Sequence, residues 1–210
     1  MSTNNTKNPH HAGLYDQIVG VAMKAFRREG IKNVTMDEIA HSLTMSKRTL
    51  YQIFSNKEEL LLACVKKEEA ERHMQHAERW ERTGNVMHFL LETFADEMAD
   101  MESVNPGFFA EIVKYPALVR YFEERNRARE AESVDFLNKG KEQGYFRHDI
   151  NFHIIYHQVI NGLNVLLKNE EMNKYSRREL FVNTVIPYIR GCSTMKGIEM
   201  IDRFIEQYGA

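Results

Sequence analysis

Residues 35–60 read TMDEIAHSLTMSKRTLYQIFSNKEEL and contain two short amphipathic helices and the start of a third. Thr35 is followed three residues later by Glu38, which is typical of a capping box at the start of a helix. In the second helix, Leu50 and Phe54 are four residues apart and are expected to pack inward. Two short helices separated by about three residues, the second with basic and amide side chains, are typical of a helix-turn-helix.

A run within this stretch resembles the DNA-binding segment of TetR-type transcriptional repressors. That family has Ser-Lys-x-x-Leu-Tyr-x-x-Phe-x-x-Lys-x-x-Leu across its recognition helix and the start of the next helix. This chain carries the pattern as Ser46, Lys47, Leu50, Tyr51, Phe54, Lys57 and Leu60. The resemblance covers roughly residues 14–62 and implies a three-helix head that binds DNA.

Two positions depart from the family pattern. Thr44 stands where the turn commonly has glycine, and Arg48 stands where a small residue is frequent. A β-branched residue in a turn with positive φ would be strained by about 1 kcal/mol. We therefore expect some strain at Thr44 but no change of fold.

The second helix is expected to lie in the major groove, with its first residues nearest to the bases. Arg48 can make a bidentate contact with guanine, and Gln52, one turn later, can pair with adenine. Ser46 is either a helix cap alone or a cap that also touches DNA. Thr35 can offer its hydroxyl group and the backbone amides of a helix N-terminus to a phosphate.

Phosphate contacts are expected from Lys47 and, by resemblance to the family, from Tyr51 and Lys57. Such contacts position a protein on the duplex, whereas contacts with base edges specify the sequence. The predicted DNA-binding residues are Thr35, Thr44, Ser46, Lys47, Arg48, Thr49, Tyr51, Gln52 and Lys57.

Charge is distributed unevenly along the 210 residues, although the net charge is only −2. Residues 24–57 hold seven Lys and Arg against three acidic residues, a net charge of +4, and the remainder carries −6. A basic head joined to an acidic body suits a phosphate-facing surface attached to a module that does not bind phosphate.

The apolar and cysteine content predicts a cytoplasmic protein without membrane contact. The longest notable apolar run, residues 60–65, is too short to span a bilayer, and the first eleven residues are polar and predict no signal peptide. Cys64 and Cys192 are isolated in the sequence, which fits a reducing compartment.

Helical periodicity continues to the end of the chain, and no stretch alternates with period two, so the predicted fold is all-α. Asp149 is expected to cap one of the later helices, and Ser176 with Glu179 forms another capping box. We predict a flexible arm at residues 1–13, a helix-turn-helix domain at 14–62, and a larger helical effector-binding and dimerisation domain at 63–210.

Helix-turn-helix proteins of this class normally act as homodimers on palindromic operators in double-stranded DNA. Gly162 permits close approach of two helices, and residues 180–189 form a wide apolar stripe. Both features are equally consistent with an intramolecular core. Resemblance to the family favours a four-helix dimer interface.

The second domain is where a TetR-like protein would hold a small-molecule effector. Met and aromatic stripes more often fill the core of a helix bundle, so two interpretations of the candidate residues stay open. The candidate pocket residues are Phe94, Met98, Phe109, Val113, Tyr156 and His157.

No metal site, cofactor or active site is predicted. His153 and His157 are four residues apart on one helical face, but no third ligand stands at a recognisable spacing. The sequence also lacks an H-E-x-x-H motif, a Gly-rich phosphate loop and a nucleophile elbow, so we expect no enzyme.

The sequence therefore predicts a sequence-specific, DNA-binding transcriptional regulator. The resemblance favours a repressor that a small-molecule effector releases from its operator. The alternative is a DNA-binding adaptor controlled by a protein partner. An enclosed cavity in the second domain would favour the repressor, and a solid core would favour the adaptor.

Overall fold

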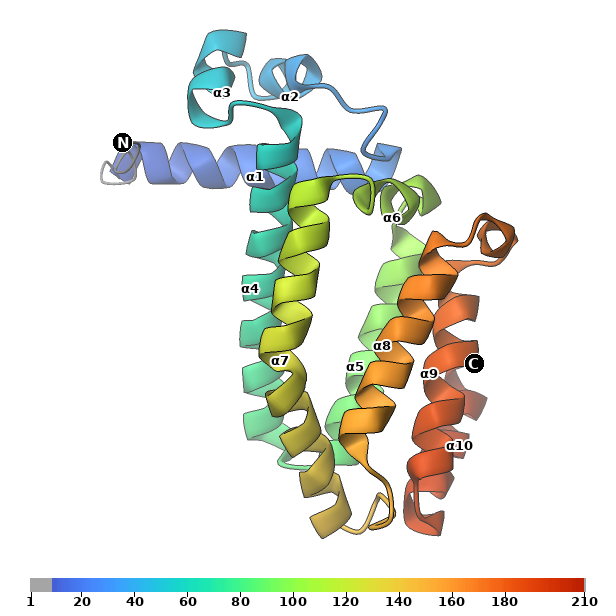
Figure 1. Cartoon of the computed structure of the whole chain (residues 1–210). Helices are drawn as coiled ribbons and strands as arrows, with labels where there is room; N and C mark the ends of the chain where they lie inside the picture. The colour runs from blue at the N-terminus through green and yellow to red at the C-terminus, as the bar shows by residue number, and fades with distance from the viewer. Residues whose placement is uncertain (1–8, 210) are drawn as a thin grey trace. The chain divides into compact units, whose positions relative to one another are not determined.

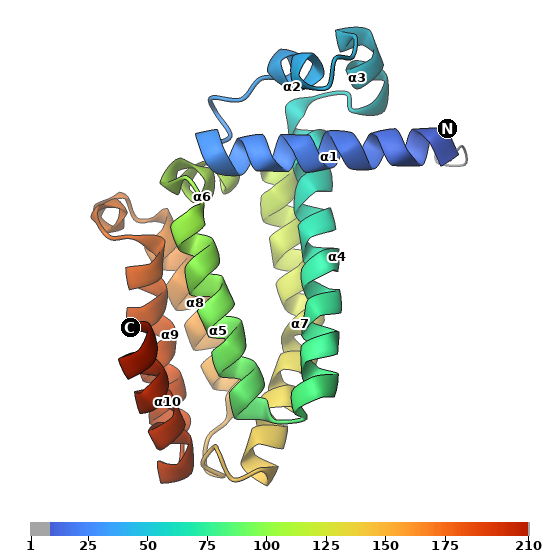
Figure 2. The same ribbon diagram turned by 180° about the vertical axis from the view of Figure 1, so that it is seen from behind.

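The computed structural model describes residues 9–209, except for the side chains of residues 9–12, 167, 168, 170 and 173 (Figures 1 and 2). In this range the chain forms helices and no strands, which confirms the predicted all-α fold. The helices are α1 (Pro9–Glu29), α2 (Met36–Ser42), α3 (Lys47–Ile53), α4 (Lys57–Thr83), α5 (Val86–Ser103), α6 (Pro106–Ile112), α7 (Pro116–Glu142), α8 (Phe152–Lys168), the 3-10 helix η1 (Glu170–Lys174), α9 (Arg177–Cys192) and α10 (Met195–Tyr208).

Contacts divide the chain into two units. Among the described residues, the head unit contains 9–73 together with 105–121, and the bundle unit contains 74–104 and 122–209. Residues 105–121 are thus grouped with the head, although they are far from it in sequence. Of the predicted arm, residues 9–13 form the beginning of α1, and residues 1–8 lie outside the described range.

The head unit is built on the apolar stripe of α1. Ile18, Ala22 and Phe26 recur every four residues and are fully buried, as the spacing predicts. The predicted capping box of Thr35 and Glu38 starts α2, and α2 and α3 lie side by side in both views (Figures 1 and 2). Leu43 follows Ile39 by four residues, a spacing that predicts core packing, but it is the C-cap of α2 and is only half-buried.

The turn between α2 and α3 contains the strain that the sequence predicts. Thr44 has φ of 53°, and it is the only non-glycine residue with positive φ in the described part of the chain. Its N–H donates to the carbonyl oxygen of His41 at 3.0 Å, which closes the turn. The left-handed backbone is therefore kept without glycine, at a cost of about 1 kcal/mol.

The bundle unit surrounds a continuous apolar core from α5, α7, α8, α9 and α10. Phe146 and Phe152 are fully buried against each other, with ring centroids 5.2 Å apart. The predicted capping box of Ser176 and Glu179 starts α9. The predicted cap at Asp149 is wrong, because Asn151 caps α8 and Asp149 instead binds Arg147.

Across the described residues, none of the helices combines the length and apolar character that crossing a bilayer requires.

Candidate nucleic-acid interface

Two buried side chains fix the orientation of α3. Leu50 and Phe54 are buried in the head core, so the remaining faces of this short helix point outward. Ser46 caps the helix by accepting the N–H of Thr49 at 3.1 Å, and its hydroxyl also lies 2.8 Å from that of Thr49. The outward side chains are Lys47, Arg48, Tyr51 and Gln52.

Arg48 and Gln52 are the candidate base readers. Both are exposed, and neither side chain makes a hydrogen bond or ion pair with any described residue. Their four-residue spacing puts them on one face of α3. Both can therefore reach a base edge without breaking an intramolecular bond.

Lys47 has a partner within the head. Its ammonium group forms an ion pair with Asp37 of α2, and both side chains are largely exposed. Exposed pairs of this kind contribute little, about 0–1 kcal/mol, because solvent screens them. Release of Lys47 to a phosphate would thus cost little.

Thr35 uses its own hydrogen-bond donors inside the head, whereas the sequence predicts that they are offered to a phosphate. Its hydroxyl and its N–H both donate to Oε2 of Glu38, at 2.8 and 2.7 Å. These hydrogen bonds hold the pKa of the Glu38 carboxyl below its ordinary value. The capping box thus already uses the two donors that Thr35 itself could offer to DNA.

Lys57 is likewise directed into the protein. Its ammonium donates to the carbonyl oxygens of Ile31 and Val34, at 2.6 and 2.8 Å. Partial burial lowers the pKa of Lys57, and the carboxylates of Glu111 and Glu38 oppose that shift. In this structure Lys57 therefore joins the loop between α1 and α2 to the start of α4.

The predicted pocket residues are divided between the two units. Phe94 and Met98 belong to the bundle core, whereas Phe109 and Val113 are half-buried residues of the head unit. In the bundle unit, Tyr156 and His157 help to line a hollow of about 240 Å³ between α7 and α8. The Tyr156 hydroxyl donates to the carbonyl oxygen of Asn126 at 2.9 Å.

The two histidines of α8 share one carboxylate. Oε1 of Glu130 lies 3.3 Å from Nδ1 of His153 and 3.0 Å from Nε2 of His157. Glu130 belongs to α7, and no sequence spacing links it to the histidines. No group of three such side chains is arranged to hold a metal ion among the described residues.

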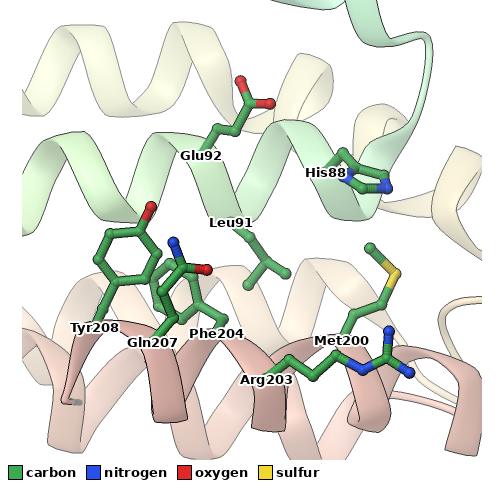
Figure 3. A pocket seen from close by; sticks show the side chains of 8 residues that line it. All are labelled: His88, Leu91, Glu92, Met200, Arg203, Phe204, Gln207 and Tyr208. Carbon is green, nitrogen blue, oxygen red and sulfur yellow. The ribbon is translucent and has the colours of Figure 1, made fainter.

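A second hollow of about 250 Å³ lies between α5 and α10 of the bundle unit (Figure 3). Leu91, Met200 and Phe204 supply its apolar part, and Figure 3 shows the polar side chains of His88, Arg203 and Gln207 around them. Sequence periodicity could not identify this groove, because its residues come from helices about one hundred positions apart.

Comparison with known proteins agrees with the geometry of the head. Residues 18–64 match the profile of the family described as bacterial regulatory proteins, tetR family. The HTH-type transcriptional repressor KstR2 of Mycobacterium tuberculosis is 26% identical over 149 residues, which cover 67% of this chain and 72% of that protein.

Solved structures with low sequence identity share the fold. A TetR-family transcriptional regulator from Agrobacterium tumefaciens has a TM-score of 0.67 and 14% identity, over 89% of this chain and all of that chain. A transcriptional-regulator structure from Saccharomonospora viridis, in complex with choline, has a TM-score of 0.62 and 19% identity, over 93% of this chain and 96% of that chain.

Proposed function

Because the chain is a transcriptional regulator of the TetR family, we propose that it is a homodimeric repressor that a small-molecule effector releases from a palindromic operator. The observation that carries the DNA-binding part is the outer face of α3, where Arg48 and Gln52 are exposed and have no intramolecular partner. The basic residues of the head supply the attraction to phosphate.

The proposed dimer contact lies on α8, because the apolar residues Val185, Ile186 and Ile189 of α9 are buried in the bundle core of the same chain. Ile154 and Val165 of α8 are 56% and 66% exposed, which is unusual for aliphatic side chains of this size. They are eleven residues apart, three helical turns, so they lie on the same side of α8. Two exposed aliphatic side chains on one side of a helix are suited to burial against a second copy of the chain.

Replacement of Arg48 tests the proposed base contact. We expect Arg48→Ala to weaken operator binding by roughly 5- to 150-fold, the loss of about 1–3 kcal/mol that one bidentate pair gives, and to relax the preference at one base pair. The measurement is selection of binding sites from random DNA, followed by titration of the selected operator at fixed salt concentration.

Lys57→Ala is the comparison for this experiment. We expect it to weaken binding to all sequences about equally, because Lys57 holds the loop that leads into α2 and reads no base. If Arg48→Ala also weakened all sequences equally, Arg48 would be a phosphate contact and the assignment of base readout would be wrong.

The proposed effector site is the hollow that Tyr156 and His157 help to line. A repressor relative and a choline-bound structure of the same fold support small-molecule control. An effector acts by binding the released state more tightly than the DNA-bound state. A panel of metabolites added to the protein–operator complex would identify one that dissociates it.

With such an effector, Tyr156→Ala should raise the concentration needed for release by about tenfold, equivalent to about 1.4 kcal/mol, without changing operator affinity in its absence. Arg203→Ala, in the groove of Figure 3, is the matched control. An effect of Arg203→Ala alone would move the site to that groove. If no small molecule altered DNA binding, the adaptor controlled by a protein partner would replace the proposed function.

A further inference from the structure

The short helix α6 and its flanking residues bond directly to the helix-turn-helix part of the head unit. The N–H of Asn105 donates to the carbonyl oxygen of Arg27 at 2.8 Å, at the last turn of α1. The N–H of Ala117 donates to Oε1 of Glu58, in the first turn of α4, at 2.7 Å. Residues 105–117 are therefore attached to both ends of the segment that carries α2 and α3.

Glu111 is the side chain of α6 that reaches the loop before α2. Its Oε2 accepts the backbone N–H of Lys32 at 2.6 Å. The loop turns at Gly30, which has φ of 87°, and a Cβ placed there would lie 3.7 Å from the same oxygen atom. The carboxylate thus holds the loop immediately after its turn.

The same carboxylate also acts on Lys57. The negative charge of Glu111 is the largest influence that favours the protonated form of Lys57, against the effect of burial. The Lys57 ammonium in turn binds the carbonyl oxygens of Ile31 and Val34. Glu111 therefore holds this loop through the Lys32 N–H, and Lys57 donates to the same loop from the start of α4.

Residues 31–34 lead without a break into Thr35, the N-cap of α2. The α2 helix packs on α3 and carries Asp37, the ion-pair partner of Lys47. A shift of the loop would accordingly move the outer face of α3, where the proposed DNA-binding side chains lie.

We propose that Glu111 is a positioning residue for DNA binding, which acts through its hydrogen bond with the Lys32 N–H. The proposal rests on the proposed function of the head. Glu111 is acidic and would repel phosphate by itself, so its contribution to DNA binding comes from the placement of the loop. Removal of Glu111 should therefore weaken DNA binding, whereas removal of an acid that only repels phosphate should strengthen it.

The test compares Glu111→Gln, Glu111→Asp and Glu111→Ala, with Glu132→Ala as the control. Gln keeps an oxygen acceptor at the same reach, Asp keeps the charge but is one methylene shorter, and Ala loses both. Glu132 is an exposed residue of α7 without a hydrogen-bond partner in the described structure. Glu132→Ala therefore removes the same charge as Glu111→Ala without removing a hydrogen bond. Affinity for the selected operator is measured well below the melting temperature of every variant.

We expect Glu111→Ala and Glu111→Asp to bind about tenfold more weakly than the wild type, and Glu111→Gln to stay within about twofold. The slope of log affinity against log salt concentration should be unchanged, because no phosphate contact is removed. If Ala did not fold, the contrast between Asp and Gln would decide the question.

Tighter binding by both Ala and Gln would show simple charge repulsion and overturn the proposal. Wild-type affinity in Ala and Asp would overturn it as well, as would equal losses in Gln and Ala. Failure of the wild type to select any DNA sequence would overturn the proposed function of the head. A wild type that binds, with variants that bind equally well, would overturn only the role of Glu111.

Discussion

Phe146→Ala should lower the free energy of unfolding by about 3–5 kcal/mol. Phe146 is fully buried in the bundle core, edge-on against Phe152, and its removal leaves a cavity that rigid helices cannot fill. At a fixed protomer concentration the melting temperature should fall by roughly 6–20 °C. Thermal unfolding followed by circular dichroism measures the change, and exposed Tyr175→Ala should change it little.

Gly140 provides an internal check on this prediction. A Cβ at Gly140 would lie 2.5 Å from Cδ2 of Phe146 and 3.0 Å from Cγ1 of Val86, so Gly140→Ala alone should cost about 1–3 kcal/mol. With Phe146→Ala the ring is gone and the same substitution should cost less, so the two effects are not additive.

The control for the glycine is Gly191→Ala. Gly191 lies in α9, and a Cβ there would meet nothing within 4 Å, so alanine should be neutral or stabilise the helix by up to about 1 kcal/mol. Strict additivity of Gly140→Ala and Phe146→Ala would show that the glycine is not required by the ring.

The parts of the fold that local chemistry determines were predictable from the sequence. The two capping boxes, Thr35 with Glu38 and Ser176 with Glu179, need only a hydroxyl and a carboxylate three residues apart. Capping preference does not choose between Asp149 and Asn151, because Asp and Asn are equally good caps. In the structure Asn151 caps α8, and the carboxylate of Asp149 is paired with Arg147.

The candidate DNA-binding site likewise contains some residues that local sequence patterns identify and others that they do not. The outward face of α3 follows from the inward spacing of Leu50 and Phe54, so Arg48 and Gln52 could be found from periodicity. The inward direction of Lys57 could not be found, because its acceptors are backbone carbonyl oxygens more than twenty residues earlier. Glu111 lies 79 residues from Lys32, and no local pattern marks the contact.

Substitution of both exposed aliphatic residues of α8, Ile154→Asp with Val165→Asp, should dissociate the proposed dimer. Full burial of one such side chain contributes about 1.5–3 kcal/mol, and each protomer of a two-fold dimer supplies both. The introduced carboxylates would also be placed in an apolar contact. We therefore expect the dimer dissociation constant to rise at least about 100-fold, measured by sedimentation equilibrium.

Operator affinity should fall together with the dimer, because a single head makes only half of the contacts with a two-fold related site. Met195→Asp in α10 is the matched control, since Met195 is 71% exposed and lies outside the proposed interface. If the double variant stayed dimeric and Met195→Asp became monomeric, the dimer interface would have to be assigned to α10 instead of α8. If the double variant bound DNA more weakly but stayed dimeric, Ile154 and Val165 would instead influence the head within one chain.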